Sequence, residues 1–335
     1  MGEAKVIKAA DVARLIDATL ARVGRVAAPI EREGRSVFSW IRSGKDVKVP
    51  PVNTSNSIKE FFFPRMSAVL RYRRKGKDVE IEGRAAAAKP FVIFGARPCD
   101  AAALDVLDKV FTWDTVDADW RARREAATVI TVACDAADDY CFCTSVGLAP
   151  DATAGADVTL FPLERGDYSA EAATAKGAVF MKESAGFFAS GGRAAKRTAR
   201  VAKRFEAAAV RASLREAFDS GFWAGASERC LGCGICTYYC PTCHCFDIQD
   251  EADAGSGVRA ACWDSCSFAL FTRHTSGHNP RPDRAARWRQ RIMHKFSYYP
   301  ERFGIVSCTG CGRCGRLCPV DLGVEESACR AAENA

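Results

Sequence analysis

The first half of the chain mixes the residue spacing of helices with that of strands. Apolar residues within 10–23 recur every three or four positions with charged residues between them, which predicts an amphipathic helix. Its apolar positions are Val12, Leu15, Ile16 and Leu20. Residues 34–51 are typical of short strands joined by turns. The three phenylalanines at 61–63, which precede Pro64, are expected to form a local aromatic core, with an interface as the alternative.

Two short apolar runs further along predict buried strands. Residues 91–94 and 128–133 are each bounded by turn residues, and a helical pattern over 101–110 lies between them. A strand, a helix and a second strand in this order indicate an α/β layer with parallel pairing. Functional groups gather at the carboxyl ends of such strands. Four cysteines follow the two strands: Cys99, Cys134, Cys141 and Cys143.

The second half of the chain predicts a different organisation. Residues 150–192 carry little signal, and a long helix is expected from about 194 to 220, with an apolar stripe and a stop at Gly221. We therefore expect a mixed α+β or α/β chain in three parts. These are an α/β domain at 1–193, a connecting helix at 194–226, and a ferredoxin-like domain at 227–335 with an insertion at 241–307.

Composition and charge set limits on the class of protein. The chain has 335 residues, of which 48% are hydrophobic, and its formal net charge is +7. We expect no membrane span, because no apolar run is long enough to cross a bilayer. No secretory leader pattern opens the chain, so a reducing cytoplasm is the expected location. Charge alone does not indicate nucleic-acid binding, and we expect no nucleic-acid partner.

Two copies of one cysteine ladder dominate the sequence. Each copy has the form C-x2-C-x2-C-x3-C-P, which is the bacterial spacing for a pair of [4Fe-4S] clusters. The first comprises Cys230, Cys233, Cys236 and Cys240, and the second comprises Cys308, Cys311, Cys314 and Cys318. Zinc ribbons also use C-x2-C pairs, but they need neither the third cysteine in step nor the trailing Cys-Pro. Disulfides are not expected in a reducing cytoplasm.

The fourth cysteine of each ladder is expected to serve the other cluster, as in two-cluster ferredoxins. One cluster is then held by Cys230, Cys233, Cys236 and Cys318, and the other by Cys240, Cys308, Cys311 and Cys314. Glycines inside both turns allow backbone conformations that bring amides close to the sulfurs. Such hydrogen bonds tune the reduction potential.

Nine of the 17 cysteines lie outside the ladders. Cys99, Cys134, Cys141 and Cys143 match the number of ligands that a third [4Fe-4S] cluster needs, although they would also suit a buried apolar role. Packing beside the clusters is the favoured interpretation of the remaining cysteines near and within the insertion, and another centre or a redox thiol pair are the alternatives. These are Cys243, Cys245, Cys262 and Cys266.

The insertion also carries histidines and a basic run. A hydrogen bond from His244 to a cluster sulfur would tune its potential, whereas His274, His278 and His294 are expected to be surface or satisfied core groups. Six Lys or Arg residues within 281–295 favour a solvated helix face, with a partner-docking surface as the alternative.

Several further segments resemble one known family. They are FGARPCDAAALDVLD (94–108), DDYCFCTS (138–145), CLGCGICTYYCPTCHCFDIQDE (230–251), WDSCSF (263–268), GHNPRP (277–282) and CTGCGRCGRLCPV (308–320). They are similar to the beta subunit of soluble nickel–iron sulfhydrogenases and to the iron–sulfur electron-transfer subunit of anaerobic sulfite reductase. The likeness runs from about residue 61 to about residue 320.

The resemblance implies a non-catalytic electron-transfer subunit of a soluble oxidoreductase complex. In that family the chain carries electrons between a flavin subunit that oxidises NAD(P)H and a separate catalytic metalloenzyme subunit. FAD and NAD(P) would then be bound only by a partner, in keeping with the lack of a G-x-G-x-x-G after a predicted strand. The alternative is a cluster-dependent reductase of a sulfur compound or disulfide that uses the extra cysteines.

Overall fold

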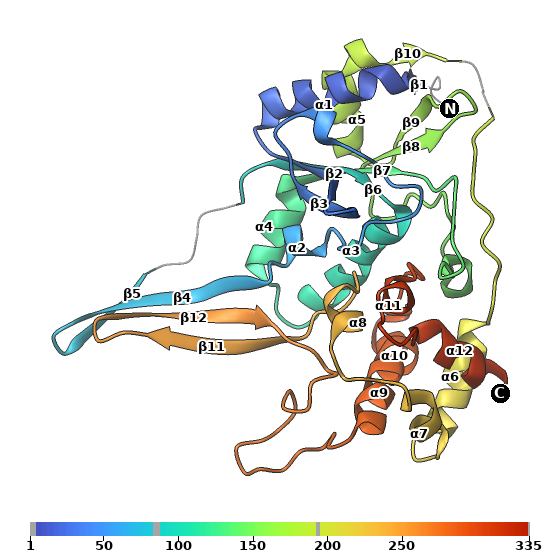
Figure 1. Ribbon diagram of the computed structural model, residues 1–335. Coiled ribbons are helices and arrows are strands. Elements are labelled where there is room, and N and C mark those ends of the chain that lie inside the picture. Colours follow the sequence, from blue (N-terminus) through green and yellow to red (C-terminus); the bar gives the residue numbers. More distant parts are fainter. Residues whose placement is uncertain (1–4, 83–87, 192–194, 334–335) are drawn as a thin grey trace.

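The computed structural model describes residues 5–82, 88–191 and 195–333. Figure 1 shows an upper layer of sheet and helices, a long arm that projects from it, and a group of helices that contains the C-terminus. The upper sheet has eight strands in the order β10-β1-β9-β8-β7-β6-β2-β3. Their bounds are β1 Lys5–Ile7, β2 Val26–Arg32, β3 Arg35–Trp40, β6 Phe91–Ala96, β7 Ala127–Val132, β8 Val158–Pro162, β9 Tyr168–Ala172 and β10 Ala189–Ser190.

The centre of this sheet is parallel, as the sequence predicts. Strands β2, β6, β7 and β8 pair in parallel, and the remaining strands add to them in antiparallel fashion. Helices α1 (Ala9–Val23) and α5 (Ala175–Glu183) cover one face with a core that includes Leu15, Ile16 and Phe180. The other face is covered by α2 (Lys59–Phe62), α3 (Pro98–Phe111) and α4 (Ala118–Ala126), and Phe62 is fully buried there. The predicted helix at 10–23 and aromatic core at 61–63 are thereby confirmed.

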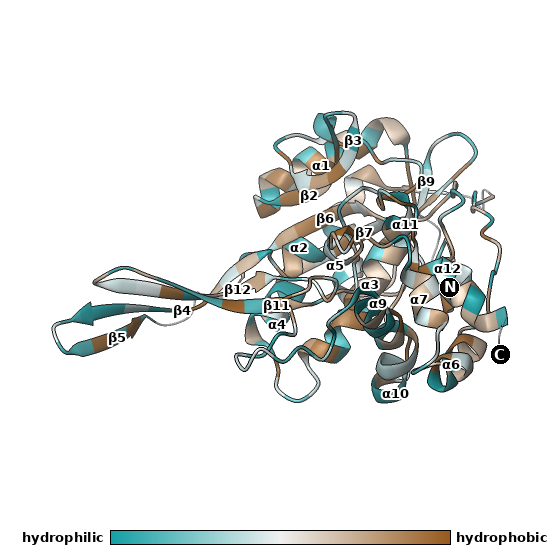
Figure 2. Ribbon diagram, turned by 60° about the horizontal axis from the view of Figure 1, so that its bottom comes forward, coloured by the Kyte–Doolittle hydropathy of each residue, from teal (hydrophilic) through white to brown (hydrophobic). Residues whose placement is uncertain are grey.

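The arm is a four-stranded antiparallel sheet built from two distant parts of the sequence. Strands β4 (Met66–Lys75) and β5 (Asp78–Glu82) come from the first half of the chain, and β11 (Phe246–Ala252) and β12 (Ser256–Trp263) come from the insertion. They pair in the order β11-β12-β4-β5. The arm projects from the body in Figure 1 and again in the turned view of Figure 2. The first half of the chain and the insertion therefore share a sheet.

The helix expected over 194–226 is wrong for residues 195–206, which are extended. Hydrogen bonds to other segments hold this backbone straight: the Arg197 amide donates to the Pro162 carbonyl and the Ala199 amide to the Cys134 carbonyl, each at 2.8 Å. Figure 1 shows the segment running along one edge of the molecule from the upper layer to the helices. Helix α6 begins only at Ala207 and ends at Glu216, and Gly221 precedes α7 (Phe222–Ser227).

The C-terminal helices enclose a third core that contacts the ladder cysteines. The core includes Trp223, Trp288 and Phe296, and five ladder cysteines pack against it: Cys230, Cys236, Cys308, Cys314 and Cys318. The other elements of this part are α8 Ile235–Tyr238, α9 Arg284–Met293, a π-helical turn at His294–Tyr298, α10 Tyr299–Phe303, α11 Arg313–Arg316 and α12 Val324–Glu333. Short 3₁₀ turns lie at Gly44–Asp46, Cys143–Val146 and Ala185–Phe187. Within the described ranges, none of the helices is long and apolar enough to span a bilayer.

Candidate metal centres

The first predicted cysteine set surrounds one cavity. Cys230, Cys233 and Cys236 of the first ladder line this cavity together with Cys318 of the second. Two glycines, Pro319 and several apolar side chains complete its wall. The fold therefore brings together all four sulfur-bearing residues of this set, including the one that comes from the other end of the domain.

The second predicted set also converges, at greater depth. Cys240 and Cys311 are buried, while Cys308 and Cys314 are partly buried. Burial raises the pKa of Cys308 to about 12, with Lys295 acting against the shift and the neighbouring Cys240 and Cys314 adding to it. Burial likewise raises the pKa of Cys314 to about 11, with Cys311 and Cys240 among the neighbours that add to the shift. Because iron binds thiolates, ligation at this set must displace protons.

The glycines of both ladders adopt conformations that other residues rarely reach. Gly232 and Gly310 have φ values of +68° and +63°. These turns aim the amide of each glycine at the first sulfur of its own ladder. The Gly232 amide donates to the Cys230 Sγ at 3.4 Å, and the Gly310 amide donates to the Cys308 Sγ at 3.5 Å. The two ladders thus have the same local geometry, and it is the geometry that stabilises a negatively charged sulfur.

Two ion pairs fasten the second ladder to the upper sheet layer. The Arg313 guanidinium donates to both carboxylate oxygens of Asp100 at 2.7 and 2.9 Å, and both side chains are fully buried. Arg316 makes a similar two-bond contact with Asp138 at 2.6 and 2.7 Å. Both arginines lie on α11, directly after Cys311 in sequence. The position of the second set is therefore determined by residues that are about 180 to 210 positions earlier in the chain.

The four N-terminal cysteines gather around a separate cavity. Cys99 lies at the start of α3, Cys134 follows β7, and Cys141 and Cys143 lie in the next loop; all four line the cavity, together with Cys311. Burial raises the pKa of Cys134 to about 12 and that of Cys141 to about 11. Because Cys311 also belongs to the second ladder set, the cavity adjoins that set.

Three buried cations lie beside the first ladder and the cysteines that follow it, and the sequence did not predict this. Lys59, Arg291 and Lys295 are each no more than 3% exposed. The Lys295 ammonium donates to the Cys240 Sγ at 3.3 Å and to the Ser307 carbonyl at 2.8 Å. Arg291 donates to the Cys243 Sγ at 3.4 Å, and Lys59 donates to the Cys243 carbonyl at 3.0 Å. Among the described interactions, none of these cations pairs with a carboxylate.

The charge states of these cations follow from their sulfur neighbours. Burial works against the charged form of Lys295, but the sulfurs of Cys240 and Cys243 hold its pKa above the ordinary value. Lys59 donates to backbone carbonyls rather than to a sulfur, and burial lowers its pKa to about 8. Unpaired buried cations are costly. The arrangement therefore favours an anionic group in the ladder sites, and a [4Fe-4S] cluster with four thiolate ligands is such a group.

The basic run 281–295 was predicted to be a solvated helix face. This prediction is wrong for Arg291 and Lys295, which are buried. Arg291 and Lys295 point into the protein toward Cys243 and Cys240. A docking role is excluded for the same two side chains, since they are buried. The sequence signal for this placement is the spacing of Arg291 and Lys295, which are four positions apart and so share one side of a helical segment.

Three cysteines outside the ladders gather beside these cations. Cys243, Cys245 and Cys266 are partly buried, and a hydrogen bond with Cys245 lowers the pKa of Cys266 to about 6. Cys243 shares a hydrogen bond with Cys240, which helps to hold the pKa of Cys240 below its ordinary range. Cys262 lies instead on β12 opposite Asp247, and the Cys329 thiol donates to Glu325 on α12 at 3.4 Å.

The histidines contribute no counter-charge to this group. Burial lowers the pKa of His244 to about 4 and that of His294 to about 3, so both rings are neutral near pH 7. The His244 Nδ1 lies 3.1 Å from the Thr242 carbonyl oxygen. The sequence predicted a hydrogen bond from His244 to a cluster sulfur, but the Nδ1 of His244 contacts this backbone carbonyl instead. His274 and His278 contact each other, with ring centroids 5.4 Å apart.

The residues fit a polynuclear iron–sulfur group. In the parts of the chain that the structure describes, no three His, Cys, Asp or Glu side chains converge closely enough to hold a single metal ion. The cysteines of the first set instead line a shared cavity, and both ladders offer amide donors to sulfur. Thiolates with apolar surroundings and hydrogen-bond donors are the environment that iron–sulfur clusters require.

Comparisons with known proteins agree with this geometry. Residues 229–322 match the family described as a 4Fe-4S dicluster domain. The chain is also similar to Sulfhydrogenase 2 subunit beta of Pyrococcus furiosus, with 32% identity over 316 residues, which covers 90% of this chain and 91% of the relative. No solved structure gives a significant match.

Proposed function

This chain belongs to the family of the sulfhydrogenase beta subunits, and from this we propose that it relays electrons between other subunits of an oxidoreductase complex. The observation that carries the proposal is the crossed cysteine set: Cys318 of the second ladder lies in the cavity of Cys230, Cys233 and Cys236. Crossed ligation is the arrangement of two-cluster ferredoxins, whose work is electron transfer.

The side chains of this chain hold the clusters and adjust their potentials. A bound [4Fe-4S] cluster supplies reversible one-electron transfer. Cys240, Cys308, Cys311 and Cys314 hold the deeper cluster, and Cys230, Cys233, Cys236 and Cys318 hold the other. Lys295 and Arg291 lie beside the sulfurs and favour the more negative, reduced state, since a buried positive charge stabilises added negative charge. The C-terminal core packs against five of these cysteines and partly buries them.

The partners that we propose are a flavin subunit that oxidises NAD(P)H and a separate catalytic subunit. The relative in Pyrococcus furiosus is named as one subunit of a sulfhydrogenase. The arm supports contacts with other subunits, because its strands expose large apolar side chains. Val79, Ile81, Phe246 and Ile248 are each at least 45% exposed. Val79 and Ile81 lie on one edge strand of the arm and Phe246 and Ile248 on the other, and an edge strand with exposed apolar side chains is a place where another chain can pair.

The proposed function predicts that the purified chain stores electrons but catalyses no substrate reduction. Anaerobic titration with dithionite is expected to reduce its clusters, as followed by visible absorbance and electron paramagnetic resonance. With the reduced artificial donor present, we expect no turnover of sulfite, polysulfide or a disulfide. Turnover by this chain alone would contradict the relay function. It would favour a reductase that uses Cys243, Cys245 and Cys266, where a thiol pKa is lowered.

We also propose a third [4Fe-4S] cluster at Cys99, Cys134, Cys141 and Cys143, which share one cavity. A Cys141→Ser and Cys143→Ser double variant is then expected to lose about four irons per chain. Iron and acid-labile sulfide analysis of the purified protein measures the loss. The matched control is Cys262→Ser, in a cysteine on β12 outside all three sets, which should retain its iron. Unchanged iron in the double variant, at the level of two cubanes, would refute the third cluster.

A further inference from the structure

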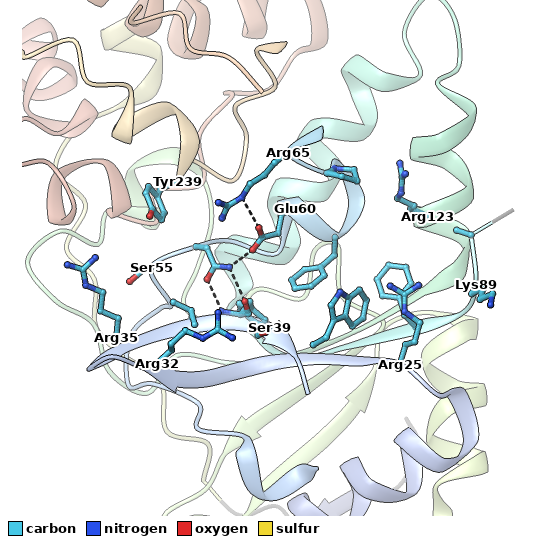
Figure 3. Close-up of a pocket in the computed structure, with 18 residues that line it drawn as sticks. Arg25, Arg32, Arg35, Ser39, Ser55, Glu60, Arg65, Lys89, Arg123 and Tyr239 are labelled. Carbon is cyan, nitrogen blue, oxygen red and sulfur yellow. Dashed lines mark hydrogen bonds and ion pairs between the residues drawn. The ribbon is translucent and has the colours of Figure 1, made fainter. Parts of the chain in front are cut away.

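A large cleft lies beside the cysteine sites on the outer edge of the eight-stranded sheet. Its volume is about 740 Å³, within the usual range for small-molecule sites. Strand β3, the turn that leads to α2, and Tyr239 form its walls (Figure 3). Tyr239 stands between Cys236 and Cys240 in sequence, so the cleft reaches the first ladder. The relay function leaves this cleft without a role.

The cleft is strongly cationic. Six basic side chains line it, and the only acid among its lining residues is Glu60. Glu60 is already engaged, because Arg65 Nε donates to it at 3.1 Å and the Asn56 amide donates to it as well. In the part of the chain that the structure describes, five of the six cations have no carboxylate partner: Arg25, Arg32, Arg35, Lys89 and Arg123. Figure 3 shows Arg32 and Arg35 toward one end and Arg25, Lys89 and Arg123 toward the other.

Aromatic rings line the same cleft. Trp40 is 42% exposed and packs edge-on against Phe61, with ring centroids 4.9 Å apart, and against Phe91 at 5.7 Å. The Arg25 guanidinium lies over the Trp40 ring, 4.2 Å from its centroid. Large apolar side chains are usually buried. An exposed tryptophan held in place by two phenylalanines therefore offers a rigid surface on which a planar ring can stack.

We propose that this cleft binds a nucleotide, with its planar ring system against Trp40 and Phe61 and its phosphate groups among the arginines. Arginine recognises phosphate through paired N–H donors without a glycine-rich loop. The absence of a G-x-G-x-x-G motif in this chain is therefore compatible with the site. A cleft of this volume lined by aromatic rings fits a small phosphate ester better than the flat surface of an acidic protein. The inference goes beyond the relay function and does not depend on it.

Calorimetric titration of the full-length, cluster-loaded chain tests the proposal. The probes are FMN, NADPH and ADP. Riboflavin, which has a planar ring system but no phosphate, and pyrophosphate, which has phosphate but no ring, serve as fragments. We expect at least one nucleotide to bind ten or more times more tightly than either fragment. FMN and NADPH are redox-active and ADP is not, so the preferred probe distinguishes a redox ligand from a non-redox one.

Two variants of the cleft and one matched control make the test specific. Arg32→Gln with Arg35→Gln, and separately Trp40→Ala, are each expected to weaken binding at least tenfold while the iron content is unchanged. Arg71→Gln with Arg74→Gln removes the same charge from exposed positions on the arm and should leave binding unaltered. The proposal is overturned if no nucleotide exceeds the fragments tenfold, or if the arm variant weakens binding as much as the cleft variants. Binding of a polyglutamate peptide but no nucleotide would also overturn it, in favour of an acidic protein partner. Failure here with full iron content leaves the relay function standing.

Discussion

Replacing Cys318 with alanine is expected to remove about four irons per chain, the content of one [4Fe-4S] cluster. The reason is that Cys318 lines the cavity of Cys230, Cys233 and Cys236, although 82 positions separate it from the last of these. Cys236→Ala is expected to cause the same loss, and the remaining clusters should stay. Iron and sulfide analysis, together with the electron paramagnetic resonance spectrum of the reduced protein, measures which cluster has gone.

Double variants test whether the ladders are crossed. Cys236→Ala with Cys318→Ala should lose no more iron than either single change, because both residues hold the same cluster. Cys236→Ala with Cys314→Ala should lose about eight irons, because these residues hold different clusters. Cys329→Ala is the control, since Cys329 donates to Glu325 and lies outside every set. A Cys236 and Cys318 double variant that lost twice the iron of the single variants would mean that each ladder holds its own cluster.

Replacing Asp100 with asparagine is expected to lower the free energy of unfolding by about 3–5 kcal/mol. The change leaves the Arg313 guanidinium fully buried without its counter-ion, and its remaining hydrogen bonds to neutral oxygens of Thr54 and Asn56 do not replace a charge. Arg313 lies between Cys311 and Cys314, so we expect the second cysteine set to be lost as the protein unfolds. Anaerobic urea denaturation, followed by circular dichroism and cluster absorbance together, measures both effects.

Two further variants separate the buried charge from the contact itself. Asp100→Leu with Arg313→Met removes both charges and is expected to recover most of the lost stability, because an apolar pair of similar volume has no desolvation cost. Glu82→Gln breaks the exposed Arg73–Glu82 pair of the arm, at 3.1 Å, and should change the free energy of unfolding by about 0–1 kcal/mol. An Asp100→Asn variant as stable as Glu82→Gln would show that the buried pair does not hold the second ladder in place.

The local elements near the candidate sites could be predicted because local pattern decides them. The buried runs at 91–94 and 128–133 became the parallel strands β6 and β7, and the cysteines that follow them share a cavity. The extended segment 195–206 could not be predicted. Its residues have an apolar spacing that suits a helix, but backbone bonds to Pro162 and Cys134 hold it straight. Such bonds depend on segments that the local pattern does not contain.

The sequence pattern also failed to predict the buried charges, and this error concerns the candidate sites more directly than the extended segment does. Arg291 and Lys295 lie in a run whose composition is typical of a solvated helix face, and Lys59 lies just before three phenylalanines. Arg291 and Lys295 are buried against thiols of the first ladder and of the residues after it, and Lys59 is buried against backbone carbonyls of the same segment. Charged residues are usually exposed. A buried one can be recognised only once the folded chain shows which group lies beside it.

The sequence by itself determined the eight ladder cysteines and the turns that present them, because a C-x2-C turn with its glycines is built from consecutive residues. It also predicted the parallel pair of strands behind Cys99 and Cys134. Only the tertiary structure decided which cations lie beside the sulfurs, how Arg313 and Asp100 join the two halves, and where the basic and aromatic side chains form a cleft. These features depend on contacts between residues far apart in the chain, and burial and charge pairing arise only once the chain has folded.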